Sequence, residues 1–490
     1  MGKKTVNVRK ILILLSIITL GSCSQSQTLT LEQQIIEDAA TALGGRDNIE
    51  NVMLLTIEAG GILSNHGQDM TPESSTLFFA ISDYKQVNNL SAKQMRLQLT
   101  KTPKFTYFRG PDPITEISGI DGDIAYNLAA NGSARQGSAS QATDLRNLYY
   151  HHPLKLVHAA LQPSATLSNG RTVNGGKLVD VTSAEGLMFT LAIDETTKLP
   201  SYIMSMENHP NLRDVSMITR FADYQDVDGL TLPTNLSRYI DDVELLTLRV
   251  SSQSINGDTV DLSPPSDVAS ATLPNTTPTE VSAEKIADHI WFLAGGYNSL
   301  VVEFSDHLVL FESSSEDRGL AVIAKARELV PGKPLTHLVN THHHFDHSGG
   351  VRAAISEGLT VMTHEANANF YKALATKPST LIPDSLEQNP KSATIISVQD
   401  KMVYEDDTMK FELYHIPGNT HASSLLMAYF PNQKLLYEAD VYSSGSSASP
   451  FAPNFYETVK ALNLDVEYII PVHGKITPLS EFLEVITAAK

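Results

Sequence analysis

Residues 341–347 read Thr341-His342-His343-His344-Phe345-Asp346-His347, so four of these seven residues are histidines. This stretch directly follows the apolar run Leu335 to Val339, which predicts a buried strand, and it precedes Ser348-Gly349-Gly350, where a helix is expected to begin. Side chains at the exit of a strand and the entry of a helix stand on rigid supports, which the geometry of a metal site requires. The stretch therefore predicts a metal site at one edge of a sheet.

The spacing inside this stretch divides its side chains between two ions. In an extended segment His342 and His344 point the same way, so both can bind one ion, whereas His343 faces the opposite way. Asp346 and His347 are displaced by the turn into the helix, which leaves them free to serve a second ion.

The residues on either side of the stretch alternate between short strands and helices. Strands are predicted over Ile290–Leu293, Leu300–Phe304, Leu308–Phe311, Leu335–Val339 and Leu359–Thr363. Helices are predicted over Leu320–Leu329, Val351–Glu357 and Glu365–Ala373. Such alternation is typical of an α/β layered fold.

The motif H-x-H-x-D-H is met by His342, His344, Asp346 and His347, and through it this half of the chain resembles the metallo-β-lactamase fold superfamily. The resemblance continues downstream through three further motifs in the family's order. They are Ile416-Pro417-Gly418-Asn419-Thr420-His421, Leu435-Leu436-Tyr437-Glu438-Ala439-Asp440 and Ile469-Ile470-Pro471-Val472-His473-Gly474.

The resemblance implies an αββα sandwich that carries two metal sites. It assigns His421 to the first site beside His342 and His344, and His473 to the second site beside Asp346 and His347. It assigns Asp440 to a bridge between the two ions, as in the hydrolase and lactonase branches of the family. Asp346 is then expected to be catalytic as well as a ligand.

Two departures from the family pattern concern His421 and Glu312. The family usually places the third histidine directly after the glycine, but Asn419-Thr420 intervene here. Counting back from the following strand favours His421, and His415 stays as an alternative. The first long strand of the family normally ends in an aspartate that supports the histidine loop, whereas Phe311-Glu312 stands here. Glu312 can still accept a hydrogen bond, although its carboxylate lies one methylene further out.

The ligand set predicts the chemistry. Nitrogen and carboxylate donors without thiolate suit two divalent ions, most often zinc, although iron or manganese can occupy the same ligands. Two such ions share a bridging water and lower its pKa, which generates hydroxide, while one of them polarises a carbonyl or phosphoryl oxygen of the substrate. The proton donor to the leaving group is open, and Tyr297, His364 and Tyr456 are candidates by position only.

The N-terminus resembles a bacterial lipoprotein signal. Residues 3–10 carry four basic side chains, Ile11 to Leu20 is apolar but too short to span a bilayer, and Leu20-Gly21-Ser22-Cys23 follows at once. Cys23 is the only cysteine in the chain, which fits an exported protein that is lipidated at this residue. Ser24 favours the outer membrane, so we expect the protein in the bacterial cell envelope, lipid-anchored and facing the periplasm.

The mature chain is predicted to contain two domains joined by a linker. Residues 23–261 have strand signals with one or two helices, which indicates a mostly antiparallel β domain. Segments such as Tyr224 to Pro233 resemble those of lipoprotein-carrier domains, whose half-open β-barrel can hold acyl chains. Residues 262–281 are rich in Pro, Ser and Thr and predict an extended linker that uncouples the domains. Residues 1–22 are the predicted signal peptide. Residues 282–490 are the predicted hydrolase domain.

These features predict an exported, membrane-anchored dinuclear metal hydrolase of small ester, lactone or similar substrates. The chain has 36 basic and 55 acidic residues and a net charge of −19, which makes a nucleic-acid partner unfavourable. A β-lactamase is the alternative enzyme, although the commonest lactam-cleaving subclasses carry Cys or Ser at the position of Asp440. The alternative of another class is a lipid-binding envelope lipoprotein whose metal domain is not catalytic.

Overall fold

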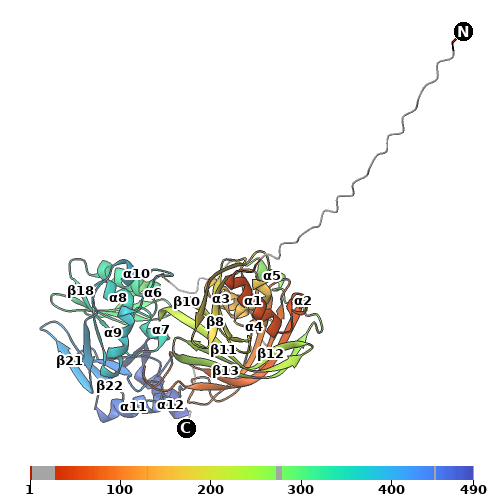
Figure 1. The fold of residues 1–490 in the computed structure, drawn as a ribbon. Coiled ribbons are helices and arrows are strands. Elements are labelled where there is room, and N and C mark those ends of the chain that lie inside the picture. The colour runs from red at the N-terminus through yellow and green to blue at the C-terminus, as the bar shows by residue number, and fades with distance from the viewer. Residues whose placement is uncertain (3–27, 130, 272–278, 446–447, 489–490) are drawn as a thin grey trace.

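The computed structural model describes residues 1–2, 28–129, 131–271, 279–445 and 448–488. The chain folds into two regions that lie side by side, one built from residues 28–261 and one from residues 282–488 (Figure 1). The predicted signal segment and Cys23 lie outside the described residues. None of the helices in the described part of the chain combines the length and the apolar character that crossing a membrane requires.

The N-terminal region is one antiparallel sheet of thirteen strands in the order β6-β5-β4-β3-β2-β1-β13-β12-β11-β10-β9-β8-β7. Its centre is the pair of β1 (Leu54–Ser64) and β13 (Val243–Ile255), which joins the two halves of the sheet. The other strands are β2 (Phe78–Asn89), β3 (Gln94–Pro103), β4 (Ile114–Asp121), β5 (Ile124–Leu128), β6 (Ala134–Gln136), β7 (Thr166–Val173), β8 (Gly176–Thr182), β9 (Met188–Asp194), β10 (Pro200–His209), β11 (Arg213–Val227) and β12 (Leu230–Ile240).

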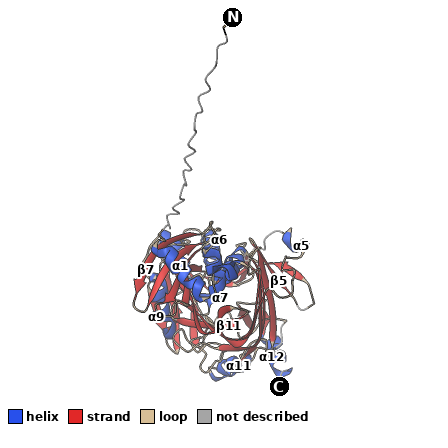
Figure 2. Ribbon diagram, turned by 45° about the vertical axis from the view of Figure 1, so that its right-hand side comes forward, coloured by secondary structure: helices blue, strands red, loops and turns tan. Residues whose placement is uncertain are grey.

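This sheet curls around helices, as Figure 2 shows. Helix α3 (Ala139–Tyr150) contacts β4 and β5 near one end of the sheet, and α1 (Leu31–Ala42) contacts β7 and β8 at the other. Both helices also contact α4 (Pro153–Ala160), so the three close the concave side. Their apolar faces and the inward strand residues form one buried core.

The N-terminal region contains more helix than the sequence predicts. The described residues before position 262 include α1, α3, α4 and the short α2 (Arg46–Glu50), where one or two helices are expected. Residues 139–160 form two helices, because Pro153 has no N–H to donate and begins α4 instead of continuing α3. The antiparallel sheet itself is as expected.

The C-terminal region contains two sheets. The first has the order β14-β15-β16-β17-β18-β19-β20, and the second β21-β22-β23-β24-β25-β26. The strands of the first sheet are β14 (Ser282–Ala287), β15 (Ile290–Ala294), β16 (Ser299–Glu303), β17 (Leu308–Phe311), β18 (Leu335–Val339), β19 (Thr360–His364) and β20 (Ile395–Val398). Those of the second are β21 (Lys401–Glu405), β22 (Lys410–His415), β23 (Leu426–Phe430), β24 (Leu435–Glu438), β25 (Tyr468–Pro471) and β26 (Thr477–Pro478).

Helices cover the outer faces of these two sheets. Alternate strand residues such as Val309 and Phe311 pack between the sheets, while Leu308 and Leu310 pack under α6. The helices are α6 (Glu316–Leu329), α7 (Phe345–Ser348), α8 (Val351–Ser356), η1 (Glu365–Asn367), α9 (Ala368–Thr376), α10 (Ser385–Gln388), α11 (Ala452–Ala461) and α12 (Leu479–Ala488). The layered α/β pattern predicted for this region is present.

The segment predicted as an extended linker is partly ordered against the sheet. Leu262 is buried, and its carbonyl accepts a hydrogen bond from Tyr126 Oη at 2.6 Å. A short helix, α5 (Ser266–Ala269), follows directly after Pro265 and buries Val268. The structure therefore corrects the expectation of a free spacer for the first half of this segment, because apolar side chains at 262 and 268 find a surface to cover.

The two regions contact each other through a buried ionic cluster, contrary to the expected uncoupling. Arg213, at the start of β11, lies 3.1 Å from Glu316 and 2.9 Å from Asp384 of the C-terminal region. Asp384 also pairs with Arg352 at 2.5 Å. Nearby, the Asp214 carboxylate accepts hydrogen bonds from Thr380. Buried charges of this kind need their partners in a fixed geometry. The two regions are therefore packed against each other and are not connected by the linker alone.

Candidate metal centre

The histidine stretch is held at the carboxyl end of β18 by its own backbone. The chain leaves β18 after Val339, runs extended through residues 340–344 and enters α7 at Phe345. Asn340 Nδ2 donates to the carbonyl of His347 at 2.9 Å, which fixes the turn between strand and helix. His342 and His344 point to the same place, whereas His343 turns away toward Ser424. The alternation predicted from an extended segment is present.

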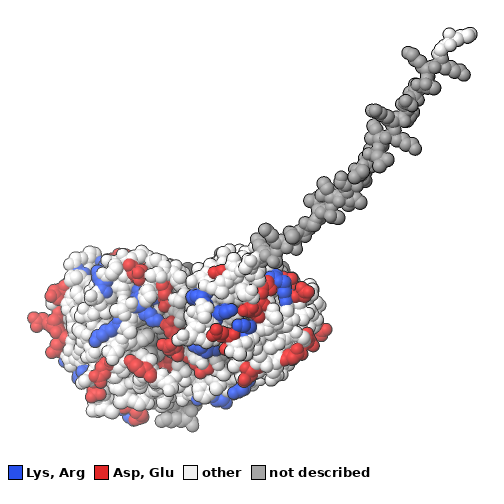
Figure 3. Space-filling view, viewed as in Figure 1, with Lys and Arg blue, Asp and Glu red and all other residues white. Residues whose placement is uncertain are grey.

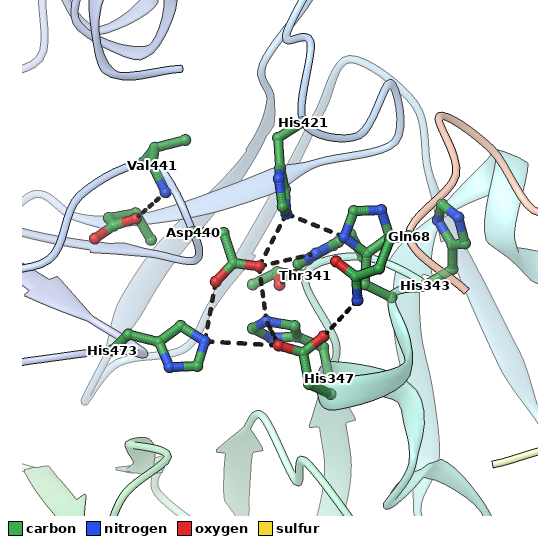
Figure 4. Close-up of polar contacts among 12 residues, drawn as sticks. Gln68, Thr341, His343, His347, His421, Asp440, Val441 and His473 are labelled. Carbon is green, nitrogen blue, oxygen red and sulfur yellow. Dashed lines mark hydrogen bonds and ion pairs between the residues drawn. The ribbon is translucent and has the colours of Figure 1, made fainter. Parts of the chain in front are cut away.

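Four side chains form the first candidate group of ligands: His342, His344, His421 and Asp440. His344 Nδ1 lies 3.0 Å from His421 Nε2, and His421 Nε2 lies 2.9 Å from Asp440 Oδ2. His342 Nε2 lies 3.3 Å from the same carboxylate oxygen. These donor atoms come from three separate loops at one edge of the two sheets (Figure 4).

A second group shares Asp440 with the first: Asp346, His347, Asp440 and His473. His347 Nε2 lies 2.9 Å from Asp440 Oδ2, and His473 Nε2 lies 2.9 Å from Oδ1 of the same carboxylate. Asp346 Oδ2 lies 3.6 Å from His347 Nε2. All seven residues predicted as ligands are thus brought together, and Asp440 stands between the two groups.

The backbone of Asp440 is held in an uncommon conformation. Its φ is 62°, a region that non-glycine residues rarely adopt. It follows β24, and the buried carboxylate of Glu438 accepts the N–H groups of Val441 at 3.1 Å and Tyr442 at 3.4 Å, which forms the turn. Strain of this kind persists where the surrounding structure imposes it, and it is common at functional sites.

The side chains present fit a pair of metal ions. Within the described residues, His342 Nε2 and His347 Nε2 are buried without a geometrically acceptable hydrogen bond, although Asp440 is close to both. Burial lowers the pKa of His342 and of His344, which leaves their rings neutral and able to present a lone pair. Burial opposes ionisation of Asp440, but His347 and the other nearby histidines hold its pKa well below its usual range. The neutral imidazoles of His342 and His344 beside an ionised carboxylate are donors that zinc accepts.

The structure distinguishes His421 from its alternative His415. His415 Nε2 lies 2.7 Å from the carbonyl of Ser423, and its ring packs on His364 with ring centres 4.4 Å apart. The two inserted residues place His421 at the site, because Asn419 Oδ1 accepts the N–H of His421 at 2.9 Å in a local turn.

Glu312 supports the histidine stretch, as predicted. Its carboxylate accepts the N–H of Thr341 at 2.7 Å, and Oε2 lies 3.3 Å from His347 Nδ1. This contact orients His347 so that its Nε2 faces the second group. The φ of Glu312 is 61°, which turns the longer side chain back toward the stretch.

The three candidate proton donors lie in different surroundings. The Tyr297 ring is 4.8 Å from the His473 ring, beside the second group. The His364 ring packs against the His415 ring, and the Tyr456 ring packs against Phe482. Of the three, Tyr297 is the one that borders the ligands.

Residues of the N-terminal region that the sequence does not single out also reach this centre. Gln68 Nε2 donates to Asp346 Oδ1 at 3.0 Å, and the carbonyl of Asp69 lies 2.9 Å from His344 Nε2. A pocket beside His344 and His421 has Phe105, Tyr107 and Phe108 in its wall. No local sequence signal marks these residues, since they lie far from the ligands along the chain.

Comparison with known families agrees with this geometry. Residues 293–473 match the family model described as the Metallo-beta-lactamase superfamily. The C-terminal region contains a metallo-β-lactamase superfamily domain. This match agrees with the enzyme class predicted from the sequence, a metal-dependent hydrolase.

Among curated proteins, this chain is similar to the 2,4-dinitroanisole O-demethylase subunit alpha of Nocardioides sp. (strain JS1661), with 24% identity over 201 residues. The match covers 39% of this chain and 57% of that protein, so it spans little more than half of the relative's length.

Solved structures to which this chain shows some similarity include three metallo-β-lactamases. DIM-1 is 17% identical, with a TM-score of 0.34, and the match covers 43% of this chain and 99% of that one. The enzyme from Pontibacter korlensis is 17% identical, with a TM-score of 0.33, and the match covers 42% of this chain and 98% of that one. The enzyme from Hirschia baltica is 17% identical, with a TM-score of 0.32, and the match covers 42% and 96%.

Proposed function

We propose that the protein is a dinuclear metal hydrolase that acts on a small ester, lactone or similar substrate. The observation that carries the proposal is the position of Asp440, whose carboxylate contacts ligands of both groups. A structural zinc site is closed by four ligands, whereas two adjoining groups that share one carboxylate are suited to a pair of ions. Zinc is the ion that these nitrogen and oxygen donors favour.

The exposure of the ligands indicates where a substrate approaches. The side chains of His342 and His347 are fully buried, but Asp346 is 34% exposed and His473 is 30% exposed. Two ions held here would lower the pKa of a shared water and polarise the carbonyl oxygen of the substrate. Asp346 Oδ2 faces His347 and His473, so it is the oxygen placed to take a proton from a nucleophilic water. Tyr297 is placed to donate one to the leaving group.

The proposal includes location and partners. The signal segment supports a lipid anchor at Cys23 in the bacterial envelope, at the outer membrane and facing the periplasm. Acidic and basic side chains are interspersed on the face shown in Figure 3, and among the coloured residues no broad basic stripe crosses it. This distribution and the net charge of −19 support a small-molecule substrate and no nucleic acid. An acyl-chain ligand of the N-terminal region stays a prediction.

A metal analysis combined with a substrate panel tests the function. The purified full chain is expected to hold two zinc equivalents and to hydrolyse an ester or a lactone faster than a β-lactam. An aryl methyl ether belongs on the panel, because the curated relative is named for O-demethylation. Asp346→Asn should lower turnover by about 100-fold or more, a typical cost of losing a general base. A chain that holds one zinc equivalent or less, or a rate that Asp346→Asn leaves unchanged, would contradict the proposal.

A further inference from the structure

We propose that residues 65–70, in the loop between β1 and β2 of the N-terminal region, hold ligands of the metal centre in position. In this loop, the main-chain carbonyl of Asp69 positions His344 and the side-chain amide of Gln68 positions Asp346. The inference rests on metal binding at this site, as proposed above. It goes further in assigning the N-terminal region a direct role in holding the ligands.

The contact with His344 selects the form of its ring. His344 Nδ1 faces the first ligand group, 3.0 Å from His421 Nε2, while Nε2 lies 2.9 Å from the carbonyl oxygen of Asp69. A carbonyl can only accept a hydrogen bond, so the hydrogen of the neutral ring sits on Nε2. Nδ1 is left with the lone pair that a metal ligand needs. The N-terminal region thus sets the tautomer of one of the predicted ligands.

The contact with Asp346 selects the orientation of its carboxylate. Gln68 Nε2 donates to Oδ1 at 3.0 Å, as Figure 4 shows. The other oxygen, Oδ2, is then turned toward His347 Nε2 at 3.6 Å and His473 Nε2 at 3.9 Å. Gln68 is therefore a positioning residue for the second group.

The loop is anchored on both sides of the centre. The carbonyl of Gly67 accepts the N–H of Phe345 at 3.1 Å, and the carbonyl of Met70 accepts the N–H of Ser423 at 2.9 Å. Within the loop, the Asp69 carboxylate accepts the N–H groups of Gly67 at 3.3 Å and of Leu77 at 3.1 Å. These bonds tie the loop to the stretch that holds His344 and to the segment that follows His421.

Glycine is required at position 67 because the ring of Phe345 lies too close for any side chain there. The φ of Gly67 is 80°, and a Cβ there would lie 2.2 Å from the ring of Phe345. That ring is in turn flanked edge-on by His66 at 5.3 Å and by His209 at 5.2 Å. A larger side chain at position 67 must displace either the loop or Phe345, which is the neighbour of both His344 and Asp346.

The first test removes the donor of Gln68 and measures metal binding. Zinc is titrated into the full-length apoprotein against a chromophoric chelator, which yields two stepwise dissociation constants. Gln68→Leu should weaken the second step at least tenfold and leave the first within about twofold, since partners of metal ligands contribute 10- to 100-fold in affinity. The matched control is Gln98→Leu, which removes a similar amide-to-carboxylate bond, to Asp83 at 2.9 Å, on the exposed sheet. Equal constants for Gln68→Leu and wild type would overturn the role of Gln68.

The second test moves the loop itself. Gly67→Ala should weaken the first zinc step at least tenfold, because the displaced loop withdraws the Asp69 carbonyl from His344. The control is Gly175→Ala, which has the same φ of 80° at the β7–β8 turn but no atom within 4 Å of the added Cβ. It carries the same backbone strain without the collision, and its zinc constants should match wild type. Wild-type zinc binding in Gly67→Ala would overturn the role of the loop.

These titrations use zinc alone, so their outcome does not depend on finding a substrate. Loss of both steps in the wild-type chain would contradict the proposed function itself. Two normal steps in wild type and in both loop variants would contradict the inference and leave the proposed function standing.

Discussion

Asp440 and His421 meet at the metal centre, with Asp440 Oδ2 2.9 Å from His421 Nε2. The two residues follow different strands of the second sheet, β24 and β22, which lie on either side of β23. The same carboxylate reaches His473 with its other oxygen at 2.9 Å. One side chain therefore links the two ligand groups, and replacing it should affect both.

Asp440→Asn keeps the shape of the side chain and removes its charge. We expect the second metal to bind at least tenfold more weakly and turnover to fall by a similar factor or more, because a neutral amide is a poorer bridge between two cations. Metal equivalents per chain and kcat, measured on protein with wild-type circular dichroism, check this. Unchanged metal content and rate would assign Asp440 a purely structural role.

His421→Ala and His415→Ala form a matched pair, because both histidines flank the irregular motif. His421→Ala should lose about one metal equivalent and most activity, since it removes one of three imidazoles from the first group. His415→Ala should keep both metals, because its ring bonds Ser423 and packs on His364 outside the centre. The opposite result in metal analysis would assign the third imidazole of the first group to His415.

Asp384→Ala should destabilise the chain by about 3 kcal/mol, because it leaves the buried Arg213 and Arg352 without their shared carboxylate. Chemical denaturation followed by fluorescence measures the loss. Glu457→Ala is the control: it breaks the exposed Lys460 pair on α11 and should leave the unfolding midpoint nearly unchanged. Equal effects of the two substitutions would show that the contact between the regions contributes little.

His209 predicts a pH dependence of stability. Burial, together with the neighbouring His66 and Arg213, lowers the pKa of His209 to about 4. The unfolded chain then binds this proton more readily than the folded chain between pH 6.5 and 4, so stability is lost as pH falls through that window. His209→Asn keeps an acceptor for the N–H groups of Asn211 and Leu212 but cannot be protonated. The melting temperature of the variant should fall less over this window than that of wild type, and parallel curves would refute the assignment.

Cys23→Ser tests the predicted lipid anchor. Two or more acyl chains hold a protein stably on a membrane, so the variant should move from the membrane fraction to the soluble fraction after cell lysis. Mass spectrometry of the wild-type N-terminus should find the lipid on Cys23. A variant that stays with the membrane must be held there by another feature of the chain.

Much of the C-terminal region could be predicted from the sequence, because its signals are local. The ligands stand at the ends of strands, so a run such as Leu335–Val339 followed by three histidines shows both the strand and the residues at its exit. The outward turn of His343 follows from the period of an extended chain. The helices of the N-terminal region were less predictable, since Pro153 can interrupt a helix or begin one, and packing decides which.

The sequence, read with its family resemblance, predicted the ligands and their chemistry, with His415 left open as an alternative to His421. The contacts of Gln68 and Asp69 with the same centre could not be predicted, because Gln68 and Asp346 are 278 positions apart and no local pattern links them. Only the tertiary structure shows that the regions are joined through Arg213 and Asp384 rather than uncoupled by a proline-rich segment. The spacing of residues along the chain indicates strands and turns. Contacts between distant loops depend on how the N-terminal and C-terminal regions pack together.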